Sequence, residues 1–166
     1  MKQLSLLKNL TQILFAFSLL AMFFLVPFWV LTFVMPQTIP FKINGETATN
    51  IPLTTKLLGG IIIGGIAFFI YALYIFKETL VLFKKKKIFD LAVIKNFKLI
   101  GRCISAGFVL TAGGSMLLSL SRNYVSIDFN FIIESIFIIC LGLFFFVLGE
   151  VFQMAKNIKE ENDLTV

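Results

Sequence analysis

The residues of this chain that could do chemistry are few, and they lie near the ends of long apolar runs. The chain has no histidine, and its two cysteines, Cys103 and Cys140, lack the close spacing that metal ligands show. No acidic residue lies at the centre of an apolar run, and there is no nucleophile elbow or phosphate-binding loop. We therefore expect a non-enzymatic protein without a metal or cofactor site.

Two ionisable residues lie slightly inside the ends of apolar runs. Of the four apolar runs in the chain, the third begins about one turn before Arg102. The fourth ends about one turn after Glu150. In antiparallel helices the two side chains would reach a similar depth, so we predict an Arg102–Glu150 ion pair with Gln153 and Glu78 nearby. The pair would act as a structural clamp at the membrane edge or, alternatively, in sensing or gating a partner site.

The densest charge cluster lies between the second and third apolar runs. It consists of Lys84, Lys85, Lys86 and Lys87, followed by Lys95 and Lys98. A lysine beside a membrane gains about 1 kcal/mol of attraction to an anionic leaflet, so lipid binding is one interpretation. Docking of an acidic cytoplasmic protein, steered by the positive field, is the other. Direct binding of nucleic acid is not expected, because no DNA-reading fold fits into this connection.

Four apolar runs must position these residues. The chain has 166 residues, of which 58% are hydrophobic, and about 20 apolar residues in a helix cross the ~30 Å hydrocarbon core of a bilayer. We predict an all-α integral membrane bundle of four transmembrane helices that forms a single domain over residues 1–166. The expected helices cover about 10–35, 57–83, 91–120 and 131–156, with outer loops 36–56 and 121–130 and an inner connection 84–90.

The distribution of positive charge predicts the orientation of these helices. Twelve lysine and arginine residues lie in the two ends and the 77–102 region, whereas only Lys42, Lys56 and Arg122 lie in the outer loops. Because cytoplasmic segments carry an excess of positive charge, both termini are expected inside. The chain is then a multi-pass protein of the cell inner (cytoplasmic) membrane, with its basic face toward an anionic inner leaflet.

Small residues recur inside the apolar runs at helical spacing. Gly60 and Gly64 form a GxxxG motif, and a stripe from Cys103 through Gly107 predicts close packing of the third helix against the fourth. Gly142 and Gly149 would supply the matching face of the fourth helix. We read all five glycines as packing positions within the chain, and a homo-oligomer through the GxxxG motif as the alternative.

Two segments resemble a known family. The stretch KKKKIFDLAVIKNFKLIGRC and the ending LGEVFQMAKNIKEENDLTV are similar to those of a bacterial four-helix membrane family catalogued as domain of unknown function 2975. Four spans with the same spacing extend the resemblance over essentially the whole chain. The family has no established catalytic or ligand residues, and its members are often encoded beside a small Cro-repressor-type helix-turn-helix protein.

The resemblance implies a cytoplasmic transcription regulator as a partner, in contact with Phe83–Lys98 and Lys156–Val166. The expected function is that of a regulatory or interaction module, which binds this partner through the basic inner face and the C-terminal tail. A small transporter or an accessory subunit of a membrane complex is the alternative.

Overall fold

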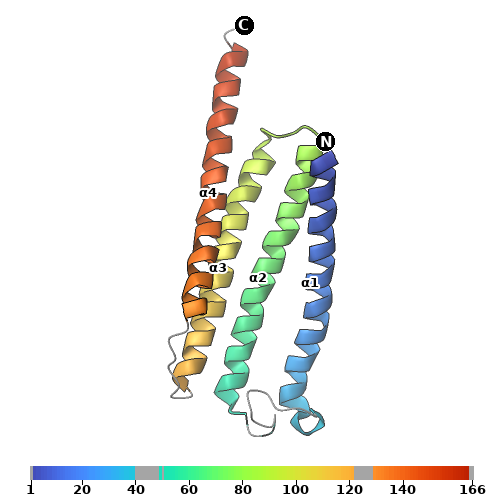
Figure 1. Ribbon diagram of the computed structural model, residues 1–166, viewed down its shortest axis with the longest axis vertical. Helices are drawn as coiled ribbons and strands as arrows, with labels where there is room; N and C mark the ends of the chain where they lie inside the picture. The colour runs from blue at the N-terminus through green and yellow to red at the C-terminus, as the bar shows by residue number, and fades with distance from the viewer. Residues whose placement is uncertain (1, 40–48, 50, 122–128, 165–166) are drawn as a thin grey trace.

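The computed structural model describes residues 2–39, 49, 51–121 and 129–164. They form the long helices α1 (Lys2–Val34), α2 (Leu53–Lys84), α3 (Leu91–Ser121) and α4 (Phe129–Leu164), with a short 3-10 helix, η1 (Pro36–Thr38), after α1 (Figure 1). The described part of the chain contains no strand. Most of the expected outer loops, 36–56 and 121–130, lies outside the described residues.

All four helices are long and apolar enough to cross a membrane, with mean hydropathies of 2.5, 2.2, 1.7 and 2.8 in their most apolar windows. Two of them are longer than the sequence pattern predicted. α1 begins at Lys2 and not near residue 10, and α4 continues to Leu164 and not to about 156. Neither extension contains glycine or proline, and the leucine, lysine and glutamate that they contain are good helix formers.

The helices stand side by side in chain order, and each runs antiparallel to the one before it (Figure 1). The backbone of α1 approaches that of α2 alone, whereas α3 packs between α2 and α4. Both termini and the 85–90 connection therefore lie at the same end of the molecule. We call this end, formed by residues 2–8, 77–98 and 150–164, the basic end.

The best-packed part of the molecule lies toward the basic end. Val93 and Thr79 are completely buried there, and Ile100 is 1% exposed. Away from this end large apolar side chains face outward, for example Phe23 at 71% and Phe137 at 68%. Lipid chains are as apolar as these side chains, so spanning segments need not bury them against protein. The basic end also keeps some apolar side chains exposed, such as Leu6 of α1 at 62% and Ile158 of α4 at 59%, so the burial there is concentrated between α2 and α3.

An aromatic cluster joins three helices at the basic end. Phe97 of α3 lies 6.0 Å from Phe83 of α2 and 5.2 Å from Phe152 of α4, measured between ring centroids. Phe89, in the connection, lies 6.4 Å from Phe152. Aromatic rings at these separations attract one another beyond the burial of their area. The cluster therefore packs the connection and the part of α4 around Phe152 against α2 and α3.

Glycines set the closest approach of α2 and α3. A Cβ atom on Gly65 would lie 2.9 Å from the carbonyl oxygen of Gly107, and a Cβ on Gly107 would lie 2.9 Å from that of Gly65. Two predictions are corrected here. Gly64 has nothing within 4 Å of its Cβ position, so Gly65 and not Gly64 makes the close contact. The side of α3 that carries Gly107 faces α2 and not α4.

The contacts of α4 use a different side of α3. A Cβ on Gly142 would lie 3.1 Å from the hydroxyl oxygen of Ser105, and one on Gly101 would lie 2.9 Å from the Gly142 carbonyl oxygen. Gly149 lies against the aliphatic part of Lys98, whose Cγ would be 2.8 Å from an added Cβ. The remaining predicted glycine, Gly60, lies under the ring of Trp29 and so packs α2 on α1.

Candidate functional site at the basic end

The connection between α2 and α3 begins with a tight helix ending built from lysines. The Lys87 amide donates to the Leu82 carbonyl at 3.1 Å, and the Lys86 amide donates to the Phe83 carbonyl at 3.0 Å. This pair of bonds is the Schellman ending, in which glycine usually takes the left-handed position. Here Lys86 takes it, with φ 59°. A side chain in this conformation costs about 1–2 kcal/mol relative to glycine.

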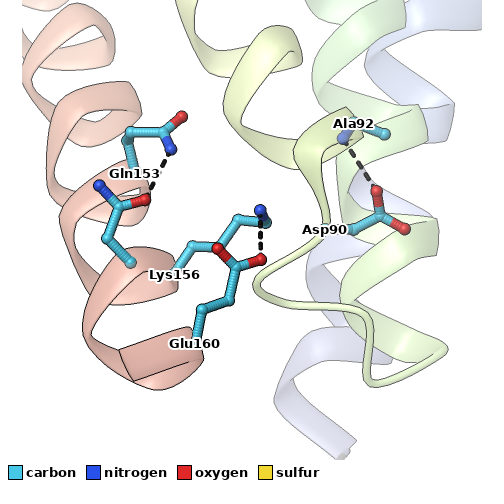
Figure 2. A network of polar contacts seen from close by, with 6 residues as sticks. Asp90, Ala92, Gln153, Lys156 and Glu160 are labelled. Atoms are coloured by element: carbon cyan, nitrogen blue, oxygen red, sulfur yellow. Dashed lines mark hydrogen bonds and ion pairs between the residues drawn. The ribbon is translucent and has the colours of Figure 1, made fainter. Parts of the chain in front are cut away.

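The connection ends where Asp90 caps α3. Its carboxylate oxygen Oδ1 accepts a hydrogen bond of 3.0 Å from the Ala92 amide (Figure 2). An aspartate just before an apolar helix is the sequence signal for such a cap. The six residues between the two helices, 85–90, are therefore held at both sides, and their side chains project from a defined turn.

The connection and the last turns of α4 enclose a hollow of about 350 Å³. Four lysines and two carboxylates line it together with two apolar side chains: Lys86, Lys87, Ile88, Phe89, Asp90, Lys156, Lys159 and Glu160. Figure 2 shows Lys156 and Glu160 on α4 beside the connection that leads to Asp90. We call this site the lysine hollow.

Both carboxylates of the lysine hollow are already engaged. Glu160 pairs with Lys156 at 2.7 Å, and Asp90 accepts from the backbone of α3. Lys159 lies over the ring of Phe89, 5.9 Å from its centroid. Within the described part of the chain, Lys86, Lys87 and Lys159 form no ion pair. The hollow therefore carries a surplus of positive charge.

Glu150 pairs with a different residue from the one that the sequence predicted. Lys98 Nζ lies 2.8 Å from Glu150 Oε1, whereas Arg102 is exposed and forms no ion pair among the described residues. The reason is the register of the helices. Lys98 lies opposite Gly149, so Arg102, four residues further along α3, lies about 6 Å from the level of Glu150.

The two residues expected near this pair have other partners. Gln153 donates to the side chain of Asn157 at 3.1 Å (Figure 2), and Glu78 pairs with Lys77 at 3.3 Å. A further contact, which the sequence did not predict, joins α3 to α2: the side-chain amide of Asn96 donates to the hydroxyl of buried Thr79 at 3.1 Å. The polar groups at this end thus form separate small contacts and not one network.

The six predicted lysines fall into different surroundings. Lys85, Lys86, Lys87 and Lys95 are exposed, and Lys84 donates to Ser5 of α1 at 3.5 Å. Lys98 is the one held by Glu150. Lys156 and Lys159, which sequence reasoning placed only in the general tail, join the connection at the hollow. The spacing of these two lysines along the fourth helix can be read from the sequence. Their contact with residues 86–90 cannot, because it depends on how α4 packs against the other helices.

The described residues hold no group of three or more histidine, cysteine, aspartate or glutamate side chains that could bind a metal ion. Cys103 is buried and Cys140 is exposed, and both are free. The predicted absence of catalysis stays a prediction.

Four long apolar helices with their ends gathered at a basic end are the architecture of a multi-pass helical membrane protein. Residues 44–166 match the family described as "Protein of unknown function (DUF2975)". The match covers well over half of the chain, and the chain belongs to this family. The matched region contains α2, the 85–90 connection, α3 and α4, whereas α1 lies before it. The match is therefore shorter than the resemblance over the whole chain that the sequence predicted. No curated protein and no solved structure matches.

Proposed function

We propose that this protein is a non-enzymatic interaction module that binds an acidic surface of a cytoplasmic protein at its basic end. A small helix-turn-helix transcription regulator is the partner that the family resemblance implies. Binding would hold the regulator at the membrane and thereby change how much of it is free in the cytoplasm.

The observation that carries this proposal is the length of α4. Beyond Glu150 the helix continues to Leu164, over about 21 Å, and rises past the ends of the other helices (Figure 1). Residues 157–162 are all exposed. A helix that leaves the membrane and is not covered by its own chain offers a rigid surface for a second protein.

Charge supports the same surface. Lys85, Lys86, Lys87 and Lys95 are exposed at the end where α4 extends, and the chain carries a formal net charge of +6. A cluster of one sign attracts an oppositely charged protein and speeds its association. The excess of lysine at this end also supports its placement on the cytoplasmic side, with both termini inside and the protein in the inner membrane.

Co-purification in mild detergent tests the proposal. The full-length protein is tagged and co-expressed with a small helix-turn-helix regulator of the Cro-repressor type, and the recovery of this regulator is measured for three variants. We expect recovery to fall when Lys84–Lys87 are replaced by glutamate, and to fall when the last ten residues are deleted. Replacement of the same four lysines by arginine keeps the charge and should keep the partner. Unchanged recovery in both of the first two variants contradicts the proposal.

The alternative of a small transporter has less support. The space between α2, α3 and α4, of about 220 Å³, is lined by apolar side chains throughout: Phe69, Ala72, Leu73, Phe76, Ile100, Ile104, Ile138, Leu141 and Phe145. A polar solute would meet no hydrogen-bonding side chain among these residues. Substrate flux in proteoliposomes that depends on Glu150 would favour the alternative.

A further inference from the structure

We propose that the lysine hollow is a binding site for the phosphate of an anionic phospholipid headgroup. The site shares Lys86 and Lys87 with the partner surface proposed above, but it also depends on Lys159 and on the hollow between the connection and α4. It does not require a second protein.

The chemistry of the lining suits a phosphate group. Lys86, Lys87 and Lys159 bring three cationic groups to one hollow from two segments far apart in the sequence, and none of the three forms an ion pair with another described residue. The four lysines of the hollow outnumber its two carboxylates, Asp90 and Glu160, so a surplus of two positive charges remains. The volume of about 350 Å³ gives room for a hydrated phosphate ester.

The conformation of Lys86 agrees with a site at this position. A glycine would satisfy the left-handed ending of α2 at lower cost, yet a lysine stands there with φ 59°. With lysine at this position, the lining of the hollow gains a positive charge that a glycine would not supply.

The depth of the hollow favours a lipid over a phosphate in solution. If the hydrocarbon core covers α4 from Phe131 to Glu150, about 30 Å, then Lys156 lies about 9 Å beyond its edge. The headgroup layer extends about 5–8 Å from the hydrocarbon, so the backbone at Lys156 lies just beyond this layer. Long lysine side chains can extend back from this level toward the headgroups. Ile88 and Phe89 are 41% and 39% exposed beside them, which places apolar groups where a lipid would enter.

Of the acidic residues that the structure describes near the end of α4, Glu160 lines the hollow and is paired with Lys156, whereas Glu161 is not among the lining residues. The glutamates at 160 and 161 belong to α4, which continues as a helix to Leu164 and past the other helices (Figure 1). While this segment stays helical, its end points away from the connection. The site is therefore open to a ligand from the bilayer.

Native mass spectrometry of the full-length protein in detergent tests the assignment, with dioleoyl phosphatidylglycerol as the probe. We expect one tightly retained lipid, and an apparent affinity at least about fivefold lower in the double variant Lys87→Gln, Lys159→Gln. The matched control is Lys85→Gln, Lys95→Gln, which removes the same charge from exposed positions outside the hollow and should keep the lipid. Lys87→Arg, Lys159→Arg should also keep it and shows that the fold survives substitution there.

Four results would overturn the assignment. An equal loss in the two glutamine variants would mean diffuse attraction and not a site. Equal retention of dioleoyl phosphatidylcholine would remove the selectivity for an anionic headgroup. Displacement by inorganic phosphate at the same concentration would make the ligand a free phosphate. Displacement by a polyglutamate peptide would make the hollow part of the protein-binding surface. None of these results depends on whether the proposed regulator binds.

Discussion

Single residues at the basic end show how strongly helix register controls ionic contacts. Of the two cations Lys98 and Arg102 on α3, the one opposite Gly149, Lys98, pairs with Glu150. The pair is partly solvated, with the side chain of Glu150 60% exposed and that of Lys98 33% exposed. Exposed pairs of this kind contribute about 0.2–1 kcal/mol.

We therefore expect Lys98→Gln to lower the free energy of unfolding by less than about 1 kcal/mol, and Arg102→Gln to leave it unchanged. Thermal unfolding of the purified protein in detergent measures both. A double-mutant cycle of each cation with Glu150→Gln gives the pair energy directly. A larger coupling of Glu150 to Arg102 than to Lys98 would contradict the register described here.

The ending of α2 makes a second prediction for a single residue. Lys86→Gly should stabilise the fold by about 1 kcal/mol, because glycine takes the left-handed conformation without a steric penalty. Lys85→Gly is the matched control, since Lys85 has φ −79° and glycine there only adds freedom to the unfolded chain. Chemical denaturation followed by circular dichroism compares the two. Stabilisation by both variants would show that loss of charge, and not backbone strain, is responsible.

At the scale of elements, the helices contact one another through two sides of α3. Gly65 meets one side and Gly142 the other, so α3 carries small residues on both. Side chains of the basic end then join α2 to α4 directly, through Phe83 and Phe152 with ring centroids 5.9 Å apart. Glycine contacts hold the spanning segments close, and aromatic contacts hold the ends.

Two adjacent glycines of α2 offer a sharp test of this packing. Gly65→Ala would place a Cβ 2.6 Å from Thr111 Cγ2 and 2.9 Å from the Gly107 carbonyl oxygen, so we expect a loss of about 1–3 kcal/mol. Gly64→Ala meets nothing within 4 Å and should be neutral or slightly stabilising. Unfolding in mixed micelles with increasing SDS measures the difference. Equal effects at the two positions would place the α2–α3 contact elsewhere.

For the whole molecule, the arrangement gathers both termini and the lysine connection at one end, with the described part of the first connection, including Gln37, at the other (Figure 1). The excess of positive charge at the basic end predicts that this end is cytoplasmic. An expected consequence is sidedness of chemical labelling.

In a background without Cys103 and Cys140, Ile88→Cys should react with a membrane-impermeant maleimide only after the cells are opened. Gln37→Cys should react in intact spheroplasts, because η1 lies at the opposite end. Mass shift on a gel measures both. The reverse pattern would invert the orientation and place the basic end outside.

The sequence by itself determined the four helices and the family. Long apolar runs can satisfy their backbone groups in lipid only as helices or closed barrels, so four helical segments follow from hydropathy, and the family follows from residues 44–166. The sequence also predicts that Asp90 caps α3, because this hydrogen bond joins two residues that are only two positions apart in the chain.

Only the tertiary structure decided which residues meet. The choice of Lys98 over Arg102, of Gly65 over Gly64, and of α4 lysines beside residues 86–90 depends on rotation and register between helices. Rotation and register depend on all the side chains that pack between two helices. A change of one residue in register would change every contact between them. The helical period of a sequence shows which residues share one face of a helix. It does not show which face of a neighbouring helix those residues will contact.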